Sequence, residues 1–191
     1  MEKTNQIDIL SKDLIIRAAL GKTCHFNAAR RNRSNNVCFG IPVILINVLL
    51  GSVLIADLNQ LIPDILKWIS ALFAIIAASL SGTQTYMKYQ NKYEEHMKVG
   101  NKLIKIEKKA ELIYRKYLDN ILTKEQFYID FEIVNREYTE ICEDSSNLQH
   151  LERDFKKALN YLKSKNNKEL VFNDIYDKIT THNRVEFHTS S

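Results

Sequence analysis

Two long apolar runs dominate the pattern of hydrophobic and polar positions. The first is Val37 to Ala56, VCFGIPVILINVLLGSVLIA, and the second is Ile65 to Gly82, ILKWISALFAIIAASLSG, which residues 83–85 extend. Each approaches the roughly 20 residues that a helix needs to cross a bilayer. A short link containing Pro63 joins them, so the two helices must be antiparallel. The pattern predicts a transmembrane helical hairpin with spans at 37–56 and 65–85.

The alternative is a helical hairpin buried in the core of a soluble protein. Helices of soluble proteins are seldom apolar on every side over this length, so the membrane interpretation is favoured. A cleaved signal peptide is not expected, because the first run begins far from the start and exceeds the length of an h-region.

The segment before the first span has the periodicity of an amphipathic helix. Ile7, Leu10, Leu14 and Ala18 share one face, and the helix runs into a basic flank. Its polar face is mixed in charge, which favours packing on other cytosolic helices over lying on the membrane surface.

A long and continuous helix is predicted after the second span. Steps of three and four residues define its apolar seam: Tyr86, Tyr89, Tyr93, Met97, Gly100, Leu103, Ile106, Ala110, Ile113, Tyr117 and Ile121. Thr123 and Gln126 form a capping pattern for the next helix, which EDSSN at 143–147 ends. A further helix is expected around Leu148, Leu151, Phe155, Ala158 and Leu162, and a last short one around Phe172, Ile175, Tyr176 and Ile179.

The predicted fold class is therefore all-α, a transmembrane helical hairpin that continues into a cytosolic helical bundle. We expect a single domain over 1–191, consisting of an amphipathic helix and basic flank (1–34), the two spans, cytosolic helices (86–180) and a flexible tail (181–191). Only two prolines and five glycines interrupt the sequence, in keeping with long helices.

The charges that flank the spans predict their orientation. Arg30, Arg31 and Arg33 precede the first span, and Lys88 and Lys92 follow the second. The link between the spans carries Asp57 and Asp64 instead. By the positive-inside rule, both termini are cytoplasmic and the link faces outward.

Small residues recur along the spans at helical spacing. The second span has one row of Ser70, Ala74, Ala78 and Gly82 and a neighbouring row of Ala77, Ser81 and Thr85, and the first span places Gly40, Asn47 and Gly51 on one face. Such rows let helix backbones approach closely in lipid. The simpler interpretation is that they join the two spans of one hairpin, and the functional alternative is that they also join neighbouring chains.

Asn47 is the polar residue near the middle of the first span. An unpaired carboxamide in hydrocarbon is costly, so it must find a partner. Three arrangements satisfy it: a bond to the second span, a bond to its copy in a neighbouring chain, or contact with water in a channel. The first two are packing roles and the third is a functional role.

The search for a catalytic or metal site finds no constellation. The three cysteines and five histidines show no metal-ligand spacing, and no phosphate-binding glycine loop or activated nucleophile is present. The net charge of +4 is small. A possible basic stripe is diluted by Glu94, Glu95, Glu107 and Glu111, which indicates a solvated helix face rather than a nucleic-acid site. Its lysines are Lys98, Lys102, Lys105, Lys108 and Lys109. We expect no enzyme activity, cofactor or metal, and no specific nucleic-acid binding.

The order of these elements resembles a known family. An amphipathic helix, the basic RRNR, two spans joined by a short link and a long helix entered through GTQTYMKY are similar to the SLATT family, the bacterial two-transmembrane effector domains associated with nucleotide-signalling and nucleotide-sensing proteins. The resemblance covers nearly the whole chain and is nearest to the fifth subfamily. It rests on architecture and not on a catalytic motif.

This resemblance implies a pore-forming effector of a bacterial conflict system, in the cell membrane. Its implied partners are an upstream nucleotide-signalling, sensor or reverse-transcriptase protein. Two helices cannot enclose an aqueous path, so a pore requires a homo-oligomer. Asn47, Gly51, Ser70, Ala74, Ala78, Ser81 and Gly82 are then the candidate pore-lining or helix-contact residues. The competing hypothesis is a membrane-anchored interaction module that conducts nothing.

Overall fold

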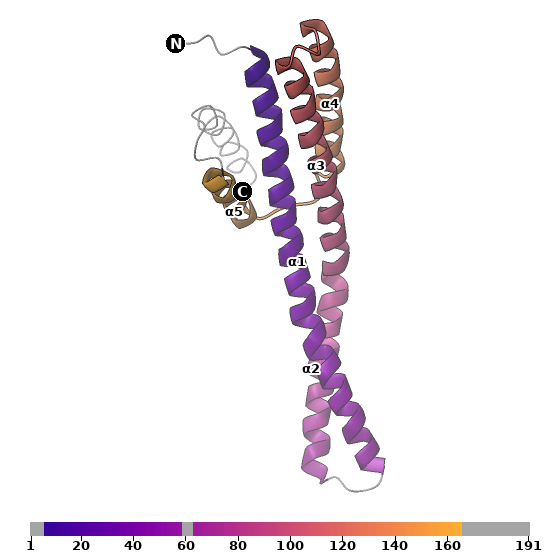
Figure 1. Ribbon diagram of the computed structural model, residues 1–191. Helices are drawn as coiled ribbons and strands as arrows, with labels where there is room; N and C mark the ends of the chain where they lie inside the picture. Colours follow the sequence, from indigo (N-terminus) through magenta and orange to yellow (C-terminus); the bar gives the residue numbers. More distant parts are fainter. Residues whose placement is uncertain (1–5, 59–62, 166–191) are drawn as a thin grey trace, which may run out of the picture. The chain divides into compact units, whose positions relative to one another are not determined.

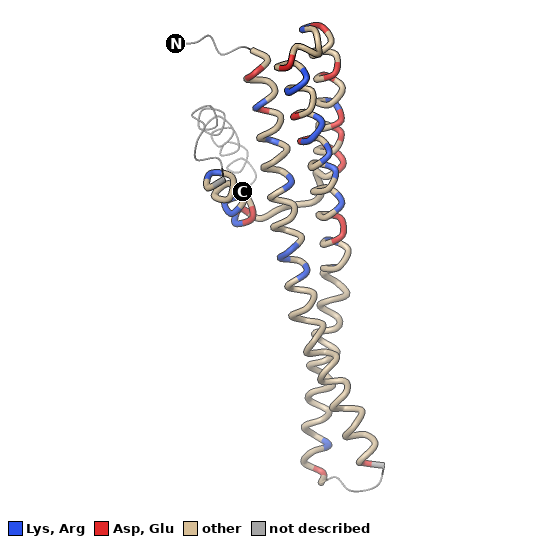
Figure 2. The backbone as a smooth tube through the Cα atoms, in the orientation of Figure 1, with Lys and Arg blue, Asp and Glu red and all other residues tan. Residues whose placement is uncertain are grey.

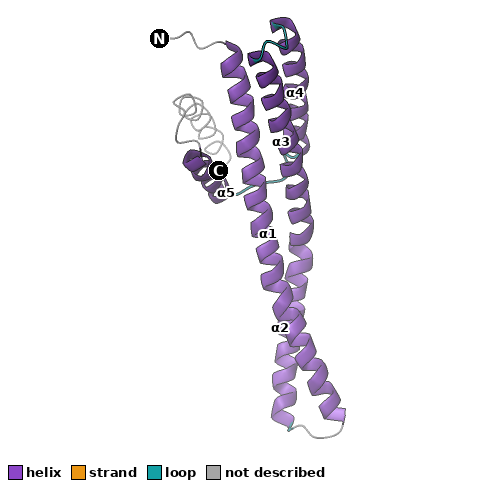
Figure 3. Cartoon of the chain, in the orientation of Figure 1, coloured by secondary structure: helices purple, strands orange, loops and turns teal. Residues whose placement is uncertain are grey.

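The fold is described from a computed structural model, which covers residues 6–58 and 63–165. These residues form α-helices and short connections, with no strand among them (Figures 1 and 3). The helices are α1 (Gln6–Leu58), α2 (Asp64–Met87), α3 (Tyr89–Leu118), α4 (Lys124–Asp144) and α5 (Glu152–Lys165). The all-α prediction is confirmed for this part of the chain. The predicted helix around Phe172 to Ile179 and the tail lie outside it.

The chain divides into two compact units. One contains residues 28–95, and the other contains residues up to 27 together with those from 96 onward. The hairpin unit therefore interrupts the helical bundle unit in the sequence, and α1 and α3 each contribute to both.

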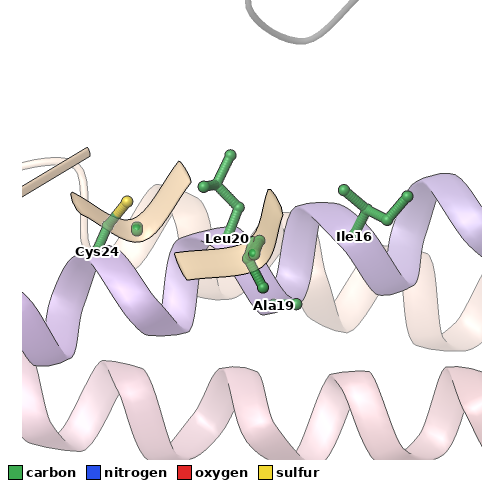
Figure 4. Close-up of a cluster of buried hydrophobic side chains, with 6 residues drawn as sticks. Ile16, Ala19, Leu20 and Cys24 are labelled. Atoms are coloured by element: carbon green, nitrogen blue, oxygen red, sulfur yellow. The ribbon is translucent and has the colours of Figure 1, made fainter. Parts of the chain in front are cut away.

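In the bundle unit, α1 packs against partners on two of its faces. On one face, Leu14 and Ala18 lie with Ile106 and Ala110 of α3 and Val134 of α4. On the other face, Ile16, Ala19, Leu20 and Cys24 pack against Ala158 and Leu162 of α5 (Figure 4). Ile7, Leu14 and Ala18 are fully buried, which confirms the face predicted for this segment.

Side-chain hydrogen bonds cap the N-termini of two helices in the bundle unit. The Thr123 hydroxyl accepts a hydrogen bond from the Gln126 backbone N–H at 3.2 Å, as the sequence predicts for an N-cap. The Asp154 carboxylate accepts one from the Leu151 N–H at 3.1 Å, so α5 begins at Glu152. Leu148 and Leu151 were expected inside this helix and instead precede it.

Two predictions about the helices are wrong. The helix predicted from Tyr86 onward is interrupted at Lys88, because α2 ends at Met87 and α3 begins at Tyr89, and it is continuous from Tyr89 to Leu118. The ends of the predicted seam are also exposed: Tyr86 is 84% and Ile121 is 68% accessible. Tyr86 lies before the break, and Ile121 lies beyond the end of α3.

In the hairpin unit, α1 continues through Pro42 without ending. Proline lacks the N–H that would bond to the carbonyl four residues earlier, here that of Cys38. α2 begins after Pro63, with Asp64 in its first turn, where a carboxylate complements the helix dipole.

Candidate functional site

The predicted spans are exposed rather than buried in the chain. The most apolar stretch of α1 contains no buried residue, and that of α2 contains almost none. Exposed large side chains occur along both, including Ile44, Leu49, Ile55 and Leu72. These are two helices long and apolar enough to span a membrane. Within residues 6–58 and 63–165, the chain does not cover these side chains, as it would in a hairpin buried in a soluble core. Figure 2 shows few charged residues along this part of the tube.

The residues proposed for pore lining or helix contact are mostly exposed. Asn47, Gly51, Ala74, Ala78, Ser81 and Gly82 are exposed, and Ser70 is partly buried. Ala77, from the neighbouring row, is the buried residue of α2.

The glycines of the small-residue rows differ in how closely the rest of the chain approaches them. A Cβ atom added at Gly51 or at Gly82 would meet no atom within 4 Å. Neither glycine therefore makes room for the other span of its own chain. The hairpin uses Ala77 in α2 and Gly40 in α1, where an added Cβ would lie 3.2 Å from the Gln84 amide.

Hydroxyl groups in α2 bond to their own helix. Ser70 donates to the Leu66 carbonyl at 2.8 Å, Ser79 to Ile75 at 2.9 Å and Thr83 to Ser79 at 2.9 Å. This bonding four residues back satisfies a hydroxyl without a partner helix. No corresponding bond within the described hairpin is found for the Asn47 side chain.

The basic flanks lie at one end of the hairpin, and the acidic residues of the link lie at the other end. Arg30, Arg33, Lys88 and Lys92 are exposed, and Arg31 is partly buried. At the other end, Lys67 lies 3.3 Å from Asp57 and 3.2 Å from Asp64, so its charge is matched. The excess of positive charge is therefore at the arginine end.

Lys88 separates α2 from α3 with a left-handed backbone, at φ 49° and ψ 42°. Residues with a Cβ adopt this region at a cost of about 1–2 kcal/mol, and glycine or asparagine is the usual occupant. Hydrogen bonds continue on both sides, from the Lys88 N–H to the Gln84 carbonyl and from the Lys92 N–H to the Lys88 carbonyl. The break is therefore a single strained residue between two intact helices.

Four side chains form a hydrogen-bonded relay beside this break. Gln84 Nε2 donates to Asn36 Oδ1 at 2.9 Å, and Asn36 Nδ2 donates to Gln90 Oε1 at 3.3 Å. Gln90 Nε2 then donates to Glu94 Oε1 at 2.6 Å. Asn36 of α1 thus connects the last turn of α2 with the first turn of α3.

An aromatic contact between α1 and α3 lies beside the same break. The rings of Phe39 in α1 and Tyr89 in α3 are stacked, with centroids 5.7 Å apart and planes at 6°. Tyr89 is buried. The face of α1 from Asn36 to Gly40 therefore contacts both sides of the break at Lys88. We call this face of α1, together with Gln84, Gln90 and Glu94, the junction.

Three histidines meet in the bundle unit. His25 Nδ1 lies 2.9 Å from His96 Nδ1, and the His25 and His150 ring centroids are 5.9 Å apart. Burial, with the nearby His96 and His150, lowers the pKa of His25 to about 4. The adjacent Cys24 thiol is buried, which raises its pKa to about 12 and keeps it protonated.

The histidine cluster is not arranged as a metal centre. Among the described residues, no three His, Cys, Asp or Glu side chains are grouped so as to hold a metal ion. The contact between the two Nδ1 atoms requires one ring to donate its N–H and the other to accept it, so at least one of the two rings is neutral.

Charged residues of α3 form ion pairs with α1 and α4. Lys109 of α3 lies 2.6 Å from Glu137 of α4, Lys102 lies 3.4 Å from Asp144, and Lys22 of α1 pairs with Glu107. These contacts fit a solvated helix face better than a nucleic-acid site.

No sequence pattern predicts the junction or the histidine cluster. Residues 25, 96 and 150 have no motif spacing, and Lys88 is not a residue type that marks a left-handed turn. The one sequence feature that could have indicated the junction is the pair of amide side chains Asn36 and Gln84, one beside each apolar run.

No protein-family model matches this chain, and no curated protein or solved structure is significantly similar to it.

Proposed function

We propose that this chain is a bacterial membrane effector whose hairpin crosses the cell membrane, with both termini cytoplasmic, and whose copies assemble into a pore. The observation that carries the proposal is the exposed carboxamide of Asn47 on an otherwise apolar and exposed span. In a bilayer this group needs a partner that its own hairpin does not supply. A neighbouring chain or water supplies it.

The exposed small residues support assembly of several chains. Ala74, Ala78 and Gly82 are exposed in the hairpin, whereas Ala77, which is next to Ala78, is buried there. A small-residue row left exposed in lipid gives a surface on which another helix can approach closely. Asn47, Ser70 and Ser81 then lie at chain contacts or along the path.

The charge distribution supports the orientation. The exposed Arg30, Arg33, Lys88 and Lys92 belong on the cytoplasmic side by the positive-inside rule. The link end, where Lys67 is matched by two aspartates, then faces outward.

The proposed role in conflict defence follows the resemblance to SLATT effectors. An upstream nucleotide-signalling, sensor or reverse-transcriptase protein supplies the trigger, and the response is disruption of the membrane. No enzymatic step, cofactor or nucleic-acid contact is part of this proposal.

The experiment is a measurement of membrane potential in single bacterial cells after induction of the full chain, alone and with its operon partners. Asn47→Leu removes the carboxamide, and Asn47→Gln retains it as the matched control. Rapid depolarisation that Asn47→Leu abolishes and Asn47→Gln preserves supports a pore with Asn47 on its path. Depolarisation in all three supports the pore and assigns Asn47 to helix contact.

The competing membrane anchor is tested in the same assay. The spans at 37–56 and 65–85 are replaced by an unrelated hairpin of equal length. An anchor keeps its cellular activity after this exchange, and a pore loses it. Full activity of the exchanged protein overturns the pore proposal.

A further inference from the structure

Four exposed cations at the basic end of the hairpin form no ion pair within the described part of the chain: Arg30, Arg33, Lys88 and Lys92. At the other end of the same unit, Lys67 lies 3.3 Å from Asp57 and 3.2 Å from Asp64. The chain therefore matches the cation at the link end by itself and leaves the cations at the basic end for another partner.

The carboxylates at the basic end do not match these cations. Residues 28–36 and 86–95 contain five basic and two acidic side chains, so a net positive charge remains there. The Glu94 carboxylate accepts a hydrogen bond from the Gln90 amide at 2.6 Å, and Glu95 is exposed. Neither glutamate forms an ion pair among the described residues.

Contacts of Asn36 place Arg33 and Lys88 at a similar level along the hairpin. The Asn36 side chain bonds to Gln84 and to Gln90, which lie on either side of Lys88 in the chain. Arg33 precedes Asn36 by three residues of one helix, which corresponds to a rise of about 4.5 Å. Arg33 and Lys88 are therefore within about one helical turn of the same hydrogen bonds.

Lys92 lies one helical turn beyond Lys88. Its backbone N–H donates to the Lys88 carbonyl at 3.1 Å. Residues in this relation are about 5–6 Å apart. Because lysine side chains are flexible four-carbon chains, both ammonium groups can reach one phosphate group over this separation.

Lys88 occupies a backbone conformation that glycine would adopt at lower cost. Its φ of 49° is left-handed, a region in which glycine or asparagine is usual. The hydrogen bonds of Asn36 hold both sides of Lys88, and the stacking of Tyr89 on Phe39 holds the next residue. A strained residue that its surroundings hold in place is characteristic of binding sites, so an exposed lysine here indicates a ligand.

We propose that Arg33, Lys88 and Lys92 bind the phosphate headgroup of an anionic phospholipid in the cytoplasmic leaflet. The predicted spans meet this side at residues 37 and 85, so in a bilayer these cations lie at the depth of the headgroups. Arginine pairs with phosphate oxygens through two N–H groups, and lysine supplies a compact charge. The inference rests on the membrane insertion in the proposed function, but it does not require a pore.

The surroundings favour a lipid over a soluble phosphate compound. The cations border an exposed apolar surface that includes Val37 and Ile41 of α1. A soluble anion would leave this surface uncovered. A phospholipid matches both parts of the site, because its acyl chains lie against the apolar side chains while its phosphate meets the cations.

The test measures lipid binding to the full chain, purified in a neutral detergent. Phosphatidylglycerol and phosphatidylcholine are titrated in parallel, and native mass spectrometry counts the lipids bound to each chain. We expect phosphatidylglycerol to bind about tenfold more tightly than phosphatidylcholine, because each basic residue near an anionic headgroup contributes several-fold in affinity.

Lys88→Gly removes the cation and keeps the left-handed backbone, which glycine adopts freely. We expect its affinity for phosphatidylglycerol to fall about fivefold, with no decrease in the temperature of unfolding. Lys88→Arg retains the charge and should retain the affinity. Arg33→Gln and Lys92→Gln should each weaken binding about fivefold, whereas Lys67→Gln, at the link end, is the control and should not.

Equal affinities for the two lipids overturn the inference, as does parent affinity in Lys88→Gly, Arg33→Gln and Lys92→Gln. Displacement of phosphatidylglycerol by millimolar inorganic phosphate assigns the cations to a soluble anion and overturns it too. Membrane depolarisation is measured separately. Depolarisation with equal lipid affinities removes the lipid site and leaves the pore. A preference for phosphatidylglycerol that the variants lose, without depolarisation even with the operon partners, leaves the lipid site and overturns the pore.

Discussion

His25 Nδ1 lies 2.9 Å from His96 Nδ1, although 71 residues separate the two in the chain. The contact joins α1 to α3, and His150 adds a third ring from the segment before α5. Electrostatically, such a cluster is stable only when at least one ring of each close pair is neutral, because two protonated rings would bring N–H groups together.

The histidine cluster predicts that the bundle unit loses stability in acid. The pKa of His25 is about 4 in the folded chain and 6.5 when solvated, so the unfolded chain binds more protons between these values. Stability is therefore fully present above pH 6.5 and declines as the pH falls toward 4. We expect His25 to account for about 1–2 kcal/mol of the loss between pH 7.5 and pH 5.

Thermal unfolding of the detergent-solubilised chain at several pH values measures this effect. His25→Asn keeps a hydrogen-bonding group near the Nδ1 position and cannot titrate. If the pH dependence of this variant equals that of the parent chain, His25 does not titrate as the buried cluster requires.

Gly100→Ala should destabilise the bundle unit. An added Cβ would lie 2.5 Å from Phe26 Cε1 and 2.8 Å from Cδ1, so the ring must move. We expect a loss of about 1–2 kcal/mol in the free energy of unfolding, because overpacking outweighs the gain in helix propensity. Denaturant unfolding followed by circular dichroism measures it.

Gly21→Ala is the control for this variant. Its Cβ would lie 3.1 Å from Leu103 Cδ1, the end of a flexible side chain. A change within about 0.5 kcal/mol is expected, since contact and propensity offset each other. Equal effects of the two substitutions would contradict the close approach of Phe26 to Gly100.

Ala77 and Ala78 should respond differently to leucine. Ala78 is exposed in the hairpin, so Ala78→Leu should leave the thermal unfolding of the detergent-solubilised monomer unchanged and weaken association in membranes about tenfold. Ala77 is buried within its own chain, so Ala77→Leu should lower the unfolding temperature as well. Chemical cross-linking in membranes reports the oligomer, and an undiminished oligomer in Ala78→Leu would place the chain contact on another face.

Thr123→Ala should cost about 1 kcal/mol of stability, because the Gln126 N–H loses the hydroxyl that caps α4. Thr139 is the control. Its hydroxyl bonds to the Asn135 carbonyl within the exposed face of α4, so Thr139→Ala should change stability by only a few tenths of a kcal/mol. Denaturant titrations of both variants distinguish a cap from an ordinary surface threonine.

Local patterns allowed much of the helix content to be predicted. The spacing of Leu14 and Ala18 identified the buried face of α1, and Thr123 identified the start of α4. These features depend on residues within a few positions of one another. The meeting of His25 with His96 depends instead on how α1 and α3 pack, and no local periodicity records it.

The small-residue rows show a second limit of prediction from sequence spacing. Spacing indicates that Ala78 and Gly82 form a face suited to close packing, but it does not identify the partner. At Gly82 the other span is not the partner, because an added Cβ there would meet no atom within 4 Å. Similarly, the tyrosine spacing predicts a straight helix through residue 88, and the amide contacts of Asn36 oppose that prediction locally.

The chain order of the two units has a consequence for how the protein is made. The bundle unit is discontinuous, and the hairpin unit is inserted between its parts. As the chain leaves the ribosome, residues 6–27 of α1 are complete while their partners in α3, α4 and α5 are still unsynthesised. Because domains fold only once their parts are present, both spans are available for insertion before the bundle can close. Under the proposed membrane function, insertion of the spans therefore precedes closure of the bundle. The face of Leu14 and Ala18 lacks its partners until translation has passed Val134, and the face of Ile16 and Leu20 lacks them until it has passed Leu162.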